Sequence, residues 1–370
     1  MTSCNHLFLC PDNNVFSGLF IDALVNKVGI KSCDITVVFF KTKVDKVSIS
    51  NDIPGVHYLD YESSGNELFK SAKTITYFSL NSFNSSVVRD VMQISHDMKD
   101  KMYMLLTDDE LERWILCYEK HGKLIVDKKS NLSKDCLWVI NNQENVIALK
   151  SAFYGKLSKF ISSSVLNVIN SSVIFDTMPS KSIESLARVV NLEFTVKENL
   201  ILIGSKPNAF NFNELKSIIR SFVRKGVNNN SKFIVIWSNK QWRQRVLFEM
   251  YILFLNKVKK ENIDLSIITS TPSLLYTTMV MSSTHLILQN RGGVSSARLF
   301  MKWGQGKVCI EKGSPNEHLY KECQSIDTLS FESFDDLACK VNDPIDIQGN
   351  ALNINEEEQR SIRELAKLYS

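Results

Sequence analysis

The feature that most constrains the fold is an alternation, along the whole chain, of short apolar runs with longer amphipathic segments. Short apolar runs are typical of buried strands, and apolar residues repeating every three to four positions are typical of helices. Near-continuous apolar strands that alternate with such helices predict a parallel sheet covered on both faces. We therefore predict an α/β fold with doubly wound sheets.

The alternation occurs twice, and 370 residues are enough for two domains, each with its own core. We predict strands at 6–10, 34–40, 56–59, 74–80, 101–106 and 136–140, and again at 199–204, 232–238, 264–269, 284–289 and 307–311. Met178-Pro179 interrupts the pattern and indicates a connection between domains. The prediction is two Rossmann-like domains facing a cleft, 1–177 and 178–350, with a final helix, 351–370, that crosses back to pack on the first domain.

Composition excludes several classes of protein. Apolar residues make up 44% and charged residues 23% of the chain, as in a globular protein, and the formal charge of +4 is too small to indicate nucleic-acid binding. The eight cysteines form no C-x-x-C pair and the histidines have no metal-ligand spacing, so we expect neither a metal site nor a cofactor. No signal peptide or membrane-spanning segment is evident, and the cytoplasm is the expected location.

Two segments of the second half are candidates for ligand binding. In open parallel sheets, ligands bind beyond the carboxyl ends of strands, near the reversal in strand order. One predicted strand runs into Gly204, Ser205 and Asn208, and another ends before Arg291. After Arg291 come two glycines and the start of a helix, Gly292, Gly293, Val294, Ser295 and Ser296.

This second loop has the chemistry of an anion site. Glycines allow the backbone to approach a ligand closely, a helix start presents unpaired N–H groups, and Arg291 adds a cation, which together suit a phosphate or pyrophosphate. The alternative is that the glycines only turn the chain and a serine caps the helix. The standard P-loop and dinucleotide fingerprints are absent, as is the D-x-D motif of metal-dependent single-domain glycosyltransferases.

Two Rossmann-like domains, a phosphate loop in the second and a returning helix are the plan of GT-B glycosyltransferases. Residues 198–214, 267–315 and 173–181 resemble the TDP-Fuc4NAc:lipid II Fuc4NAc transferase family, which makes enterobacterial surface polysaccharide. In the first half only 102–114 and 137–149 match in position. The family's aromatic-Gly-x-Asp stretch is replaced by Leu106-Thr107-Asp108-Asp109, and the E-x7-E pattern of many retaining enzymes is missing, because Leu319 stands eight residues after Glu311.

The resemblance implies a glycosyltransferase that needs no metal. A nucleotide-diphosphate sugar would be the donor, and a glycan, lipid-linked or protein acceptor would receive the sugar, in bacterial surface polysaccharide or glycoconjugate synthesis. The protein would then make peripheral contact with the inner face of the membrane. Backbone N–H groups and Arg291 would stabilise the charge of the departing diphosphate.

An inverting transfer also needs a group that takes the acceptor's proton. Asp109 is the first candidate and Asp12 the second, because both follow predicted strands. An equally good interpretation of Asp109 is an acidic residue in the first turn of a helix. Glu311 ends a strand and is a candidate hydrogen-bond acceptor for a ribose or sugar hydroxyl, although a solvated strand end is the favoured interpretation.

Three alternatives remain open on sequence alone. A GT-B-like sugar-nucleotide epimerase would have the same fold and no acceptor, and a binding or scaffold protein would keep the fold without catalysis. The third concerns the helix 245–260, which is strongly apolar and ends in basic residues. That composition suits contact with a membrane surface, although core packing is the favoured interpretation.

Overall fold

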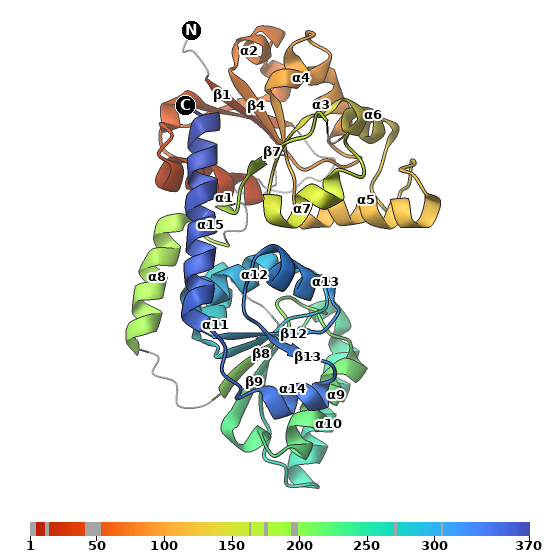
Figure 1. The fold of residues 1–370 in the computed structure, drawn as a ribbon, viewed down its shortest axis with the longest axis vertical. Helices are drawn as coiled ribbons and strands as arrows, with labels where there is room; N and C mark the ends of the chain where they lie inside the picture. Colours follow the sequence, from red (N-terminus) through yellow and green to blue (C-terminus); the bar gives the residue numbers. More distant parts are fainter. Residues whose placement is uncertain are drawn as a thin grey trace. The chain divides into compact units, whose positions relative to one another are not determined.

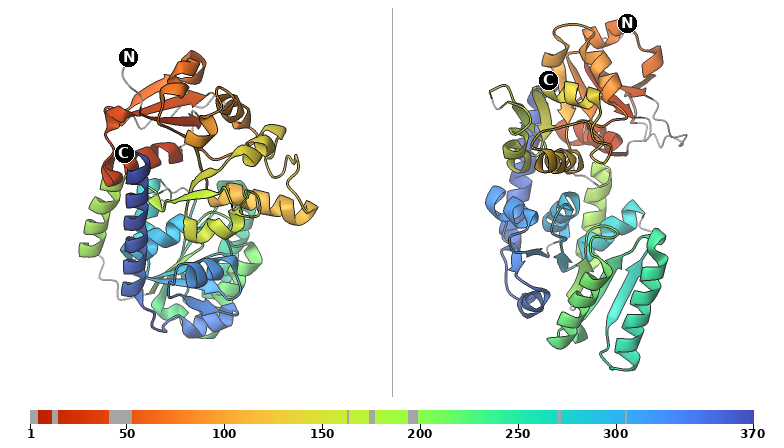
Figure 2. Two further views of the ribbon diagram at one scale, coloured as in Figure 1. Left: turned by 45° about the horizontal axis from the view of Figure 1, so that its top comes forward. Right: turned by 90° about the vertical axis from the view of Figure 1, so that its right-hand side faces the viewer.

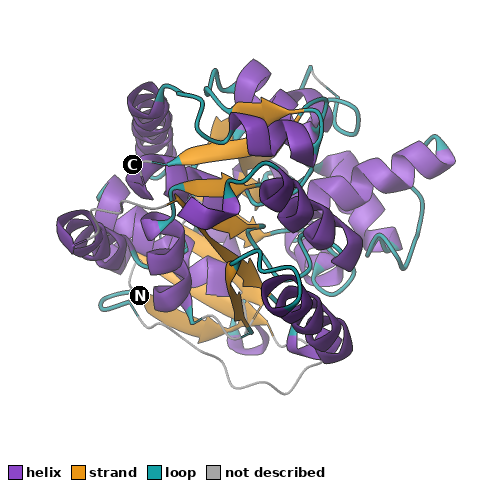
Figure 3. Cartoon of the chain, turned by 90° about the horizontal axis from the view of Figure 1, so that it is seen from below, coloured by secondary structure: helices purple, strands orange, loops and turns teal. Residues whose placement is uncertain are grey.

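The computed structural model describes residues 5–11, 15–40, 53–162, 164–173, 177–193, 199–269, 272–304 and 306–370. The chain divides into two compact units, Met1–Ile174 with Glu357–Ser370, and Phe175–Glu356. Figure 1 labels their helices and strands, and Figures 2 and 3 show the strands of each sheet with helices against both faces. The predicted α/β fold with two doubly wound sheets is therefore confirmed.

Unit 1 contains a parallel sheet in the order β3-β2-β1-β4-β5-β6-β7. Its strands are β1 (His6–Pro11), β2 (Ile35–Phe40), β3 (His57–Asp60), β4 (Thr74–Phe78), β5 (Met102–Leu105), β6 (Asn145–Ala148) and β7 (Asn167–Asn170). The helices between them are α1 (Val15–Ala23), α2 (Asn66–Ser71), α3 (Ser85–Met92), α4 (Met98–Lys101), α5 (Asp108–His121), α6 (Lys134–Asn142) and α7 (Lys150–Leu157).

Unit 2 contains a second parallel sheet, in the order β10-β9-β8-β11-β12-β13. Its strands are β8 (Asn199–Ile203), β9 (Ser231–Ile236), β10 (Asp264–Ile268), β11 (His285–Ile287), β12 (Lys307–Glu311) and β13 (Leu329–Phe331). Its helices are α8 (Ser180–Glu193), α9 (Phe212–Arg224), α10 (Trp242–Lys257), α11 (Ser273–Ser282), α12 (Val294–Leu299), α13 (Pro315–Glu317) and α14 (Phe334–Lys340).

The helices of unit 2 form two layers. Helix α9 contacts α10 and α14 on one face of the sheet, and α11 contacts α8 and α12 on the other. The first layer covers a buried apolar cluster that includes Ile201, Phe222, Phe233 and Phe248. Burying such side chains contributes roughly 1.5–3 kcal/mol each, which fixes the sheet edge on which the loops described below are mounted.

The last helix, α15 (Ile347–Leu368), begins in unit 2 and ends in unit 1, as the sequence predicts for a helix that crosses back. In unit 1 the buried hydroxyl of Ser361 accepts hydrogen bonds from the Ser172 backbone N–H (3.0 Å) and from Asn170 Nδ2 (3.1 Å). Beyond the helix, Tyr369 is buried against Phe8 and shares a hydrogen bond with Thr76. These contacts make the C-terminal residues part of the first core.

One predicted strand is wrong. The apolar run 136–140 lies in α6, because the Ser133 side chain accepts a hydrogen bond from the Cys136 N–H and so starts a helix. Cys136, Val139 and Ile140 are buried at helical spacing on one face. The strands that follow, β6 and β7, as well as β13 in unit 2, are not among the predicted strands.

Candidate binding site at the switch point of the second sheet

The strand order of unit 2 reverses between β8 and β11. From β8 the chain proceeds to β9 and β10 on one side, and from β11 it proceeds to β12 and β13 on the other. The loops after β8 and β11 therefore border the crevice in which open α/β sheets bind ligands. These are the two loops that the sequence singles out, and they lie side by side at one edge.

Gly204 fixes the path of the loop after β8. Its φ of 78° lies in the left-handed region, and a Cβ there would stand 2.5 Å from the Cβ of Ala209. The Gly204 N–H donates to the carbonyl oxygen of Ile287 (2.9 Å), so this loop is joined to β11 at its first residue. Asn208 is exposed and also has a left-handed φ, 61°.

A buried polar network ties the two loops together. Gln289 Nε2 donates to the Ser205 hydroxyl (2.9 Å), and Gln289 Oε1 accepts from the Ser205 backbone N–H (3.2 Å). The Tyr276 hydroxyl donates to the Ser205 carbonyl oxygen (2.8 Å) and shares a hydrogen bond with the Ser296 hydroxyl. Burial raises the pKa of Tyr276 and keeps it a neutral donor. Ser205 and Ser296 thus hold the loops in place.

The loop after β11 is shaped by Gly292 and Gly293, whose φ angles are 75° and 80°. A Cβ on Gly293 would stand 2.5 Å from Ser205 Oγ and 2.9 Å from Gln289 Nε2, so only glycine fits between the two loops. Asn316 supports the loop from the side, because its Nδ2 donates to the carbonyl oxygens of Gln289 (2.6 Å) and Gly292 (3.0 Å).

Helix α12 starts directly from Gly293 and continues as a π-helix, Phe300–Gly304. A glycine in the N-cap position offers no side-chain cap, and none is formed. The backbone N–H groups of this first turn carry partial positive charge, to which the half-buried Arg291 adds a full charge nearby in the chain. Ser295 is half-buried and Val294 is buried. The loop has the electrostatics of an anion site.

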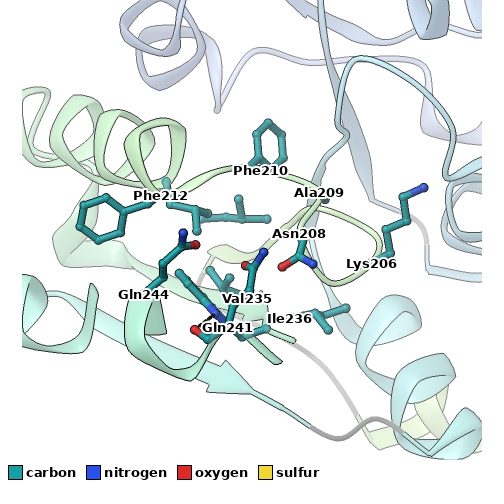
Figure 4. A pocket seen from close by; sticks show the side chains of 12 residues that line it. Lys206, Asn208, Ala209, Phe210, Phe212, Val235, Ile236, Gln241 and Gln244 are labelled. Atoms are coloured by element: carbon teal, nitrogen blue, oxygen red, sulfur yellow. Dashed lines mark hydrogen bonds between the residues drawn. The ribbon is translucent and has the colours of Figure 1, made fainter. Parts of the chain in front are cut away.

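A narrow pocket adjoins this edge at the ends of β8 and β9. Figure 4 shows Asn208 and Gln244 reaching into it from opposite sides, whereas the ammonium end of Lys206 points away. Trp237 also lines the pocket and is stacked on Phe248 at a ring-centroid distance of 5.6 Å. A cavity volume of about 10 Å³ has room for about one water molecule, so this pocket is not itself a nucleoside site.

Glu311 lies elsewhere at the same edge of the sheet. It lines a second pocket, of about 210 Å³, together with Arg224 and Asp335, which form an ion pair. The pocket lies between α9, α14 and the ends of β12 and β13. Glu311 therefore faces the α9 layer.

The candidate bases of unit 1 have different surroundings. Asp109 is an exposed first-turn residue of α5 whose carboxylate pairs with Arg113 one turn on. Its neighbour Glu110 is half-buried and accepts a hydrogen bond from the Thr107 hydroxyl at the helix start. Burial raises the pKa of Glu110, whereas the Thr107 hydrogen bond lowers it. Asp12 lies outside the described residues.

Several residues of the site carry no clear sequence signal. Gln289 ends an apolar run and can be recognised in the sequence for that reason, but Tyr276 and Asn316 become neighbours of the loops only through the fold.

Across the described residues, no group of three or more His, Cys, Asp or Glu side chains is placed to hold a metal ion. Among the described helices, none has the length and apolar character needed to cross a membrane.

Comparisons with known proteins identify the fold. No family model matches the chain, and no curated protein matches it in sequence. A glycosyltransferase from Rickettsia africae has a similar structure, with a TM-score of 0.57 and 11% identity over 99% of this chain and 97% of that one. A UDP-forming trehalose-phosphate synthase from Burkholderia xenovorans has a TM-score of 0.55 and 11% identity over the same shares.

A third similar structure is that of Anabaena HepE in complex with UDP and glucose, with a TM-score of 0.54 and 10% identity over 97% of this chain and 95% of that one. At such identities the likeness establishes the fold alone. The chain has the GT-B fold of glycosyltransferases, with two Rossmann-like domains.

Proposed function

We propose that the protein is a glycosyltransferase that takes a sugar from a nucleotide-diphosphate donor and needs no metal ion. The observation that carries this proposal is the junction of the loops after β8 and β11 at the switch point of the second sheet. The GT-B fold supports it, because similar structures include a glycosyltransferase and a UDP-forming trehalose-phosphate synthase, and another similar structure is in complex with UDP and glucose.

The chemistry follows from the charge of the leaving group. As the glycosidic bond breaks, negative charge grows on the diphosphate, and groups fixed in advance around that charge lower the barrier. Arg291 and the backbone N–H groups of Gly292, Gly293 and the first turn of α12 would bind the diphosphate. Ser205, Gln289 and Tyr276 would hold these groups in position through the buried network.

For the base that takes the acceptor's proton, we favour Glu110 over Asp109. A carboxylate is a more effective base when its pKa lies closer to the working pH, and burial shifts the pKa of Glu110 in that direction. Asp109 is exposed and occupied by Arg113. Both residues follow β5 at the carboxyl edge of the first sheet, so variants of both are compared in the experiment below.

The acceptor is proposed from the sequence. The likeness of 198–214 and 267–315 to the Fuc4NAc transferase family favours a lipid-linked saccharide, with bacterial surface polysaccharide as the product. The departure at Leu106-Thr107-Asp108-Asp109 concerns the unit that would bind the acceptor, so glycans and proteins belong in the same screen. A lipid-linked acceptor would be met at the cytoplasmic face of a membrane.

A test is release of the nucleoside diphosphate from UDP-, TDP- and GDP-sugars, with and without acceptors and with EDTA present throughout. We expect release that depends on an acceptor and persists in EDTA. Arg291→Ala should lower the rate about 10²–10³-fold, as expected for removal of one group that stabilises the developing charge. Arg220→Ala, which removes an exposed arginine of α9 in the same unit, is the matched control and should leave the rate unchanged.

For the base, Glu110→Gln should slow transfer about 10²–10⁴-fold while donor binding persists. If Asp109→Asn has this effect and Glu110→Gln does not, the base is Asp109. Conversion of a nucleotide sugar into its epimer without any acceptor would instead indicate an epimerase and would refute the transferase.

A further inference from the structure

Helix α10 has two faces of different character. Phe248 and Ile252 are buried on one face, where Phe248 packs against Trp237 and Tyr251. The other face is apolar and exposed, so the structure departs from the core packing that the sequence favours for 245–260. The exposed residues are Trp242 (56%), Val246 (37%), Leu247 (56%), Met250 (60%), Leu253 (55%), Phe254 (48%) and, at the C-cap, Val258 (62%).

These seven side chains form one continuous stripe. At 100° per residue they lie within an arc of about 160°, and the stripe runs the whole length of the helix. Single exposed apolar side chains are normal, whereas a contiguous patch of this kind marks an interaction surface. Figure 2 shows the helix beside α9, on the outside of the α9–α10–α14 layer.

The charges on this face have one sign. Arg243 and Lys257 are exposed and lie within the same arc. Within 242–258, all of which the structure describes, the one acidic residue is Glu249, which lies at the border of the stripe and pairs with Arg245 at 3.4 Å. Lys259 and Lys260 follow the helix and are exposed. The face is therefore apolar with cations and without carboxylates.

The geometry points to an anionic membrane surface as the partner of this face. An interfacial helix inserts its apolar side chains below the lipid headgroups, while lysine and arginine contact the phosphates. Trp242 suits this position because its indole is amphipathic, and the Arg243 guanidinium lies 5.6 Å from the centre of its ring. Two copies of the face packed together would instead bring four cations into an interface with no carboxylate to pair them, which is unfavourable.

This inference rests on α10 alone and is tested without sugar or nucleotide, so its failure would leave the proposed transferase untouched. If the transferase activity and the membrane binding are both correct, the enzyme would meet a lipid-linked acceptor at the membrane surface that α10 binds. Gln241 and Gln244, which line the narrow pocket at the ends of β8 and β9, stand at the start of this helix. The sheet edge that carries the proposed donor loops is therefore next to the proposed membrane-binding face.

The experiment is co-sedimentation of the full chain with vesicles. We expect binding to phosphatidylcholine vesicles that contain about 30 mol% phosphatidylglycerol, and weak binding to phosphatidylcholine alone. Leu253→Glu should weaken binding at least tenfold, because an apolar side chain that would insert into the lipid is lost and a charge that the anionic lipid repels is added. Arg243→Gln and Lys257→Gln should each weaken binding to the anionic vesicles about fivefold.

The matched control is Leu352→Glu, which changes a leucine of similar exposure (62%) on α15 in the same unit and should bind as the unaltered chain does. Equal loss in Leu253→Glu and Leu352→Glu would overturn the proposal, as would absence of binding to the anionic vesicles. A self-associating protein that Leu253→Glu converts to a monomer, without lipid binding, would assign the face to a second copy instead.

Discussion

The two units share one sheet order, with β1, β2, β3 and β4 of unit 1 corresponding to β8, β9, β10 and β11 of unit 2, yet their switch points differ. After β4 the turn is built by side chains, because Asn84 Nδ2 donates to the carbonyl oxygens of Phe78 (3.1 Å) and Ser79 (3.0 Å). Ser79 is held there at a φ of 48°. After β11 the turn is built by two glycines, and the amide that bonds its carbonyl oxygens comes from Asn316, farther along the chain.

The difference teaches how one topology can serve two tasks. In unit 1 a side chain within the turn itself, that of Asn84, bonds the backbone groups of the turn. In unit 2 the turn is glycine, which brings two backbone segments together and carries no side chain of its own. Helices α3 and α12 both start without a side-chain cap, so the two switch points differ in their turns. We therefore propose unit 2 as the phosphate-binding unit, and the following predictions test that proposal.

The largest expected effect is that of Gly293→Ala. The new Cβ would meet Ser205, Gln289 and Leu288 at 2.5–2.9 Å, and a left-handed φ is unfavourable for alanine. We expect a loss of roughly 3 kcal/mol in the free energy of unfolding, measured by urea titration. Gly313→Ala is the matched control, because its φ is 75° but its Cβ would meet nothing within 4 Å, so about 1 kcal/mol should be lost. Equal losses would show that the loops are not in close contact.

In unit 1, Asn84→Ala should be nearly as destabilising, since the buried side chain makes hydrogen bonds to Phe78, Ser79 and the Asn81 N–H. Removing these bonds should cost about 2–3 kcal/mol of unfolding free energy. Nucleotide affinity should not change in this variant. A Gly293→Ala variant with normal affinity, or an Asn84→Ala variant without affinity, would reverse the assignment of the two switch points.

A smaller effect is the pH dependence of stability that comes from His285, the first residue of β11, at the sheet edge opposite the binding loops. Burial lowers the pKa of His285 from 6.5 to about 4, and its Nε2–H donates to the Val341 carbonyl oxygen (2.8 Å). The unfolded chain therefore takes up a proton between pH 6.5 and 4 that the folded chain does not, and stability falls as pH falls through this window. Between pH 7 and 5 we expect a loss of about 2 kcal/mol from this residue.

His285→Gln should remove this part of the pH dependence in urea titrations. The pKa of His6 in unit 1 is also lowered, mainly by burial, so a weaker dependence of the same sign should persist in the variant. An unchanged pH dependence in His285→Gln would show that the imidazole is not the group responsible.

The sequence predicts the sheets and both loops of unit 2, because apolar strands and glycines carry local signals. It does not predict α6, since a short apolar run suits either element and the Ser133 cap decides between them. The network of Tyr276, Ser205 and Gln289 is also beyond its reach, because these residues are 71 and 84 positions apart in the chain. For α10, hydropathy alone cannot distinguish a buried face from an exposed one.

The central claim is that the loop of Arg291, Gly292 and Gly293 binds the diphosphate of a nucleotide. The most direct measurement is the thermal unfolding of the full chain with UDP, TDP and GDP, without added metal. At about 100 times the dissociation constant, the correct nucleotide should stabilise unit 2 by about 2.7 kcal/mol, or about 5–10 °C. Arg291→Ala should lose this shift and Arg220→Ala should keep it. No shift with any of the three nucleotides, or an undiminished shift in Arg291→Ala, would contradict the assignment.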